Sequence, residues 1–181
     1  MMIDIGCSSC SHSYRRIAST FLFCCSLFVL SRVITGPENT YFERCFEALG
    51  VSEQEISDTP TAEVTSKFCK LMTDAAKSQN LEEMLAVIVV CEWAYLSWGQ
   101  AVLANKDQPV CRKDFVTYEW VDLHSGPGFE SVIAYLRGLL DREGERLKAT
   151  SSDDRLKNCE RRFLEAVNLE EEFFDFAYKS D

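Results

Sequence analysis

Proline and glycine are scarce in this chain, with four prolines and eight glycines among 181 residues. These two residue types mark turns, and their scarcity argues against a turn-rich sheet fold. The long stretches between them are rich in Leu, Glu, Lys and Ala, which favour helices. Together with 46% hydrophobic residues, enough for one core, this predicts a single all-α domain.

Positive charge is also in short supply. The chain has 19 Lys and Arg against 29 Asp and Glu, a formal net charge of -10. Proteins that bind phosphate backbones or anionic lipid surfaces carry an excess of basic residues. We therefore expect neither nucleic acid nor a membrane as a partner.

The sequence lacks the usual signatures of metal and nucleotide sites. His12 and His124 are the only histidines, and Cys7 and Cys10 form a lone CxxC without a second pair at zinc spacing. The motifs GxSxG, GxGxxG and HExxH and the P-loop are missing as well. We therefore predict no structural metal site, and we exclude the commonest hydrolase and nucleotide-binding classes.

The nine cysteines are odd in number and irregularly spaced, which does not suit a disulfide framework. Four of them fall on or beside apolar helical faces, where a free cysteine packs as a small hydrophobe: Cys45, Cys69, Cys91 and Cys159. A reducing compartment is the simpler interpretation, and we expect a cytoplasmic protein.

Residues 1–36 differ in character from the rest of the chain. Arg15 and Arg16 precede an apolar run from Ile17 to Leu30, which is short for a membrane span. The preferred interpretation of this run is a core helix or a divergent, incorrectly assigned N-terminus. The second interpretation is a secretory or organellar signal over residues 15–31, and a membrane anchor is the third. We expect 1–36 to pack poorly, and 37–181 to form the helical domain.

Helical periodicity and capping residues predict the helices of that domain. A break is expected at Gly36-Pro37, and a loop holding His124 is expected from Leu123 to Gly128. The expected helices run from Glu38 to Leu49 with Gly50 as the cap, from Thr59-Pro60 to Ser78, from the cap Asn80 to Asn105, from Phe115 to Asp122, from Phe129 onward, and from Ser152 almost to the end.

Two residues stand out as candidates for chemistry. Cys91 shares the apolar face of the central helix with Tyr95, and Glu170 lies within an apolar stripe of the last helix. A buried carboxyl has a raised pKa, as a general acid needs, and a thiol is a nucleophile when activated. From periodicity alone Cys91 is more simply a packing residue, and Glu170 is as easily a residue that reaches solvent at the helix edge.

Three segments in order resemble the signatures of the TenA/thiaminase II family. The stretch from Cys91 to Gly99, CEWAYLSWG, resembles the family's CxWxYxxxG. The stretch from Trp120 to Phe129, WVDLHSGPGF, is similar to the family segment Trp-Ile-x-x-Tyr/His-x-x-x-x-Phe. The stretch from Leu169 to Tyr178, LEEEFFDFAY, is similar to LExxFWDxAY. The resemblance covers roughly Glu38 to Tyr178.

The resemblance implies a fold and a reaction. The fold is a heme-oxygenase-like helical bundle, here without its usual first helices, assembled as a homotetramer without a cofactor. The reaction is hydrolysis of an exocyclic C–N bond, converting aminomethylpyrimidine to hydroxymethylpyrimidine or thiamin to pyrimidine and thiazole. By motif, Cys91 is the nucleophile and Glu170 the acid/base, and Tyr95 and Phe173 line the ring pocket.

The sequence departs from the family pattern at three places. Phe68 replaces a tyrosine, with Val64 as the other possible register, and His124 replaces a second tyrosine. The family's N-terminal Gln-Asp-Tyr segment, whose aspartate binds the aminopyrimidine, has no counterpart before Glu38. The alternative to a thiamin-salvage hydrolase is therefore a catalytically impaired binding or assembly module of the same fold.

Overall fold

The computed structural model describes residues 35–179, which form helices and no strands. This confirms the all-α prediction. The helices in chain order are α2 (Thr35–Ala48), α3 (Glu53–Asp58), α4 (Glu63–Lys77), α5 (Leu81–Ala104), α6 (Phe115–Ser125), α7 (Pro127–Ala149) and α8 (Asp153–Lys179).

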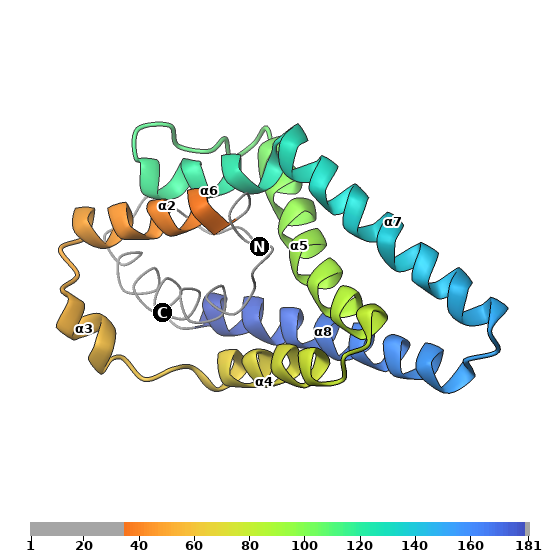
Figure 1. Ribbon diagram of the computed structural model, residues 1–181. Coiled ribbons are helices and arrows are strands. Elements are labelled where there is room, and N and C mark those ends of the chain that lie inside the picture. The colour runs from red at the N-terminus through yellow and green to blue at the C-terminus, as the bar shows by residue number, and fades with distance from the viewer. Residues whose placement is uncertain (1–34, 180–181) are drawn as a thin grey trace.

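Helix α5 is the centre of the bundle and contacts α4, α6, α7 and α8 (Figure 1). Helices α4 and α8 lie side by side along one edge, and α2 and α6 pair along the opposite edge. Buried side chains fill the seam between α5 and its neighbours because α5 is apolar on nearly every face. This central position is the one that the wide apolar surface of residues 81–104 predicts.

By length and composition α5 would also be able to cross a membrane, but half of its apolar window is buried inside the bundle. A helix that is apolar all round is equally typical of a protein core. Its packing against four other helices explains its composition, so the structure gives no reason to place it in a membrane.

Helix α2 ends as the sequence predicts, at a glycine. Gly50 has φ +64°, and its N–H donates to the Glu47 carbonyl at 3.1 Å. The N–H of Val51 donates to the Phe46 carbonyl at 2.9 Å, which completes a Schellman cap. The start of α2 differs from the prediction. The helix begins at Thr35, so Pro37 lies in its first turn, where a missing N–H costs nothing.

A short helix that the sequence analysis missed precedes α4. In α3 the Ser52 side chain accepts from the Glu55 N–H, and the Glu55 carboxylate accepts from the Ser52 N–H, which together form a capping box. Thr59 then ends α3 by donating its N–H to the Glu55 carbonyl at 3.1 Å. The predicted start of α4 at Thr59-Pro60 is therefore wrong, because Pro60 lies in the link and α4 begins at Glu63.

The predicted boundary between α6 and α7 is also wrong. Helix α6 continues to Ser125, and only Gly126 separates it from Pro127, the first residue of α7. The expected loop from Leu123 to Gly128 is thus almost entirely helical, and His124 lies in the last turn of α6. Gly and Pro together suggested a long loop, but Pro at a first helical position is compatible with an immediate restart.

Two buried carboxylates join the start of α5 to α8. Asn80 caps α5 as predicted, but its side-chain amide donates to Glu83 at 2.8 Å. The adjacent Glu82, fully buried, accepts two hydrogen bonds from the Arg155 guanidinium at 2.7 and 2.8 Å. Glu83 accepts a further bond from Arg162 at 3.2 Å. These pairs lock α8 against the first turn of α5.

The expectations for the N-terminal segment, including the targeting signal over 15–31 and poor packing of 1–36, fall almost entirely on residues 1–34. Those residues lie outside the described part of the chain.

Candidate active site

The structure brings Cys91 of α5 and Glu170 of α8 into direct contact. The Cys91 thiol lies within hydrogen-bonding range of the Glu170 carboxylate and favours its ionised form. Both side chains are buried, at 9% and 7% exposure. The contact exists because Cys91 lies on the face of α5 that packs on α8, the helix with which α5 shares its longest seam. Two residues 79 positions apart in sequence thus form one polar pair inside an apolar seam.

The surroundings of Glu170 favour the neutral carboxyl. Burial raises the pKa of Glu170 from 4.5 to about 7, and the thiol hydrogen bond opposes this only in part. Within the described residues its Oε2 atom is buried without a hydrogen-bond partner. A carboxyl whose pKa is raised toward neutrality can both give and take a proton at ordinary pH, which is the property of an acid/base residue.

Two aromatic rings lie in the same buried cluster as Cys91. Phe68 from α4 and Phe173 from α8 belong to the core cluster that Cys91 joins, together with Val64. Phe173 is one helical turn beyond Glu170, so it lies over the same part of the seam. The position where the family resemblance expects a tyrosine is thus occupied by the buried side chain of Phe68, with Val64, the other register, beside it.

Tyr95 and His124 lie in an aromatic network that begins one turn along α5 from Cys91. The Tyr95 ring centroid is 5.4 Å from that of His124 and 5.8 Å from that of Phe174. The Phe174 ring in turn is 6.1 Å from that of Phe173. All six residues that the sequence nominated are therefore linked through direct or ring contacts. Their roles in binding and catalysis stay predictions.

His124 is held rigidly by its own helix. Its Nδ1 is 2.8 Å from the Trp120 carbonyl oxygen, and its ring centroid is 3.9 Å from that of Trp120. Because a carbonyl only accepts, Nδ1 carries the proton, and in the neutral ring Nε2 is an acceptor. His124 is 2% exposed and lies in the last turn of α6, so its expected place in a loop is wrong.

Gly99 explains how α6 reaches this position. A Cβ at Gly99 would lie 3.0 Å from the His124 carbonyl oxygen and 3.3 Å from the Ser125 Cβ. Only glycine lets the end of α6 approach α5 so closely. The glycine that closes the segment CEWAYLSWG therefore places the backbone of His124.

Among residues 35–179 no group of three or more His, Cys, Asp or Glu side chains is arranged to hold a metal ion. The chemistry that the described residues offer at this site is thiol and carboxyl chemistry inside an aromatic wall.

A family model described as TENA/THI-4/PQQC matches residues 31–180, most of the chain. The chain belongs to the TENA/THI-4/PQQC family. Among curated relatives of this family, an aminopyrimidine aminohydrolase from Halalkalibacterium halodurans is 29% identical over 133 residues. That alignment covers 72% of this chain and 55% of the relative, so the chain spans about half the length of the protein it matches.

The fold agrees with the family. The crystal structure of a TenA family transcription regulator from Silicibacter sp. TM1040 superposes with a TM-score of 0.68 at 19% identity. The superposition covers 94% of this chain and 82% of that one. At this identity the likeness establishes the helical architecture alone, and it confirms the predicted bundle.

Proposed function

We propose that this TENA/THI-4/PQQC member is a thiamin-salvage hydrolase that cleaves the exocyclic C–N bond of an aminopyrimidine. The supporting observation is the buried pair of Cys91 and Glu170, in which a thiol contacts a carboxyl whose pKa burial raises to about 7. The related aminopyrimidine aminohydrolase supports the same substrate class. Aminomethylpyrimidine, with thiamin as the second substrate, is the first compound to test.

In the proposed reaction the Glu170 carboxylate accepts the proton of the adjacent Cys91 thiol, and the sulfur adds to the electron-poor ring. Glu170 then returns that proton to the ring or to the leaving amine, so that the exocyclic C–N bond breaks. Water then adds to the exocyclic carbon and gives a proton to Glu170, and the C–S bond breaks as the sulfur takes up that proton to restore the thiol. Phe68 and Phe173 supply apolar walls for the ring, and Tyr95 and His124 supply polar atoms beside it.

The first test is Cys91→Ser in the full chain, with release of hydroxymethylpyrimidine measured by chromatography. We expect turnover to be abolished and folding to be retained, because the exchange removes the nucleophile and almost keeps the volume. Cys45→Ser is the matched control, since Cys45 is equally buried but lies in the cluster between α2 and α6. Turnover that survives in Cys91→Ser would refute the proposal.

Glu170→Gln tests the acid/base role in the same assay. We expect turnover to fall by roughly two to four orders of magnitude, the usual contribution of a positioned acid/base group. A wild-type chain that binds the pyrimidine without turnover would instead favour the alternative, a catalytically impaired binding module.

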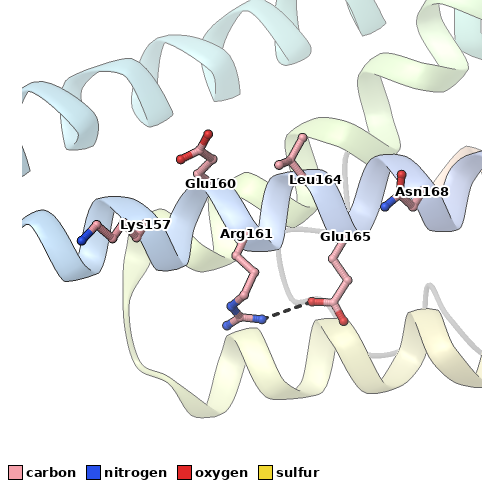
Figure 2. A pocket seen from close by; sticks show the side chains of 6 residues that line it. All are labelled: Lys157, Glu160, Arg161, Leu164, Glu165 and Asn168. Carbon is pink, nitrogen blue, oxygen red and sulfur yellow. Dashed lines mark hydrogen bonds and ion pairs between the residues drawn. The ribbon is translucent and has the colours of Figure 1, made fainter.

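We also propose that the chain self-associates, as the family resemblance implies, and that α8 supplies one contact. Its outer face carries a shallow hollow of about 580 Å³ lined by Lys157, Arg161 and Leu164 among others (Figure 2). Leu164 is 54% exposed. An antiparallel copy of α8 centred on Leu164 would bring Lys157 opposite Glu171, since each lies seven residues from it. Light scattering tests this: we expect an oligomer that Leu164→Asp dissociates, and a monomeric wild type would refute it.

A further inference from the structure

Thr65 of α4 carries a buried hydroxyl. Its side chain is 3% exposed, and among the described residues Oγ1 makes no hydrogen bond. Two other hydroxyls of α4 bond back to their own helix: Ser66 donates to the Ala62 carbonyl and Thr73 to the Cys69 carbonyl. Leaving a buried hydroxyl unsatisfied is costly, so its retention calls for an explanation.

The packing of α4 on α8 shows which side of their seam Thr65 occupies. Lys67 of α4 donates to Glu172 of α8 at 2.9 Å, and both are partly exposed, so this ion pair marks the outer side of the seam. Residues two apart on a helix point about 160° away from one another. Thr65 precedes Lys67 by two, and Glu170 precedes Glu172 by two. Thr65 and Glu170 therefore share the inner side, where α5 carries Cys91.

The two helices run antiparallel, because Asp74 later in α4 lies within electrostatic range of Arg162 earlier in α8. From the level of the Lys67–Glu172 ion pair, Thr65 therefore lies two residues toward one end of the seam and Glu170 two residues toward the other. At 1.5 Å per residue, these four residues separate Thr65 from Glu170 by about 6 Å along the helix axes. This spacing is comparable with the width of a six-membered ring carrying polar groups on opposite edges. The inner side thus holds two buried polar atoms that have no hydrogen-bond partner in the described part of the chain, Thr65 Oγ1 and Glu170 Oε2.

We propose that the Thr65 hydroxyl is a specificity-determining contact that hydrogen-bonds one polar edge of the aminopyrimidine while Glu170 faces another. A hydroxyl both donates and accepts, so it suits either a ring nitrogen or an amino group. The inference rests on the proposed function, since it takes the aminopyrimidine as ligand. Thr65 lies on α4, away from the pair of Cys91 and Glu170 that performs the chemistry, so it acts in binding.

Thr65→Val tests this in the full chain, because valine keeps the shape of threonine and removes only the hydroxyl. Calorimetric titration with hydroxymethylpyrimidine should show binding about tenfold weaker, the usual value of one hydrogen bond to a ligand. Steady-state turnover should show a raised KM and a kcat within about threefold of the wild type. The melting temperature should stay the same or rise, because the variant no longer buries an unpaired hydroxyl.

Two further variants complete the design. Thr65→Ser keeps the hydroxyl and should bind the pyrimidine nearly as the wild type does. Thr73→Val, the matched control in the same helix, removes a hydroxyl that already bonds the Cys69 carbonyl and should leave the Kd unchanged.

Each other outcome overturns the inference in a recognisable way. A wild type that binds no aminopyrimidine removes the proposed function and this inference with it. A wild type that binds, together with a Thr65→Val that binds equally well, removes the Thr65 contact alone. Weaker binding with a lowered melting temperature, or weaker binding that Thr65→Ser does not restore, would show a structural role for Thr65 instead.

Discussion

Replacing Glu170 by glutamine should make the protein more stable at alkaline pH, and the gain should depend on pH in a defined direction. Burial raises the pKa of Glu170 to about 7 in the folded state, against an ordinary 4.5. Between these values the folded protein holds a proton that the unfolded chain has released. The free energy of unfolding therefore falls as pH rises through this window. Glutamine does not titrate, so Glu170→Gln escapes this loss.

The magnitude follows from the same two pKa values. A pKa raised from 4.5 to about 7 corresponds to roughly 3 kcal/mol between the fully protonated and fully ionised limits. The difference in unfolding free energy between Glu170→Gln and the wild type should be near zero around pH 4.5. It should grow through pH 6 and approach roughly 3 kcal/mol, as an upper figure, by pH 8.

Urea denaturation followed by circular dichroism at several pH values measures this directly. Glu171→Gln is the matched control, since Glu171 is the next residue of α8 and is exposed; its difference from the wild type should stay flat with pH. A flat difference for Glu170→Gln as well would refute the buried, partly protonated carboxyl, and with it the physical basis of the acid/base role.

Two stability predictions concern the contacts that position α5. Glu82→Ala should lower the unfolding free energy by about 1–3 kcal/mol, because it removes a fully buried carboxylate that accepts two hydrogen bonds and leaves the half-exposed Arg155 to solvent. Glu145→Ala, in an exposed ion pair, should cost less than about 1 kcal/mol. Gly99→Ala should cost about 1–3 kcal/mol despite the higher helix propensity of alanine, because its Cβ would lie 3.0 Å from the His124 carbonyl oxygen. Thermal and urea unfolding check both predictions, and a neutral Glu82→Ala or a stabilising Gly99→Ala would contradict these contacts.

The long helices were predictable because their apolar periodicity is sustained, and α5 and α8 begin within a residue of their expected starts. The errors fall at short elements and junctions. The six-residue α3 has too little periodicity to detect, although Ser52 and Glu55 carry a capping-box signal. The junction at Gly126 looked like a loop because glycine and proline mark turns as well as helix starts.

The candidate site was likewise predictable only in part. Helical spacing places Cys91 and Glu170 on apolar faces, but only packing decides that those faces meet, since 79 residues separate them. The burial of Glu82 was not predicted, because first-turn acidic residues are typical of exposed caps and the matching Arg155 lies far along the chain. Thr65 gave no signal at all, because a lone threonine in an amphipathic helix is indistinguishable from an exposed one.

The buried polar groups around α5 differ along its length in whether they have hydrogen-bond partners among the described residues. At its first turn the buried Glu82 is fully satisfied by Arg155, an arrangement that fixes α8 in one register. Further along, Thr65 and Glu170 each bury one polar atom that has no hydrogen-bond partner within residues 35–179, a cost of about 1–3 kcal/mol apiece to the folded state. A polar ligand that binds beside the Cys91 thiol and hydrogen-bonds to these two atoms would remove their cost, and this gain would add to its binding free energy. On this argument the ligand should stabilise the protein most strongly where Thr65 and Glu170 are both intact.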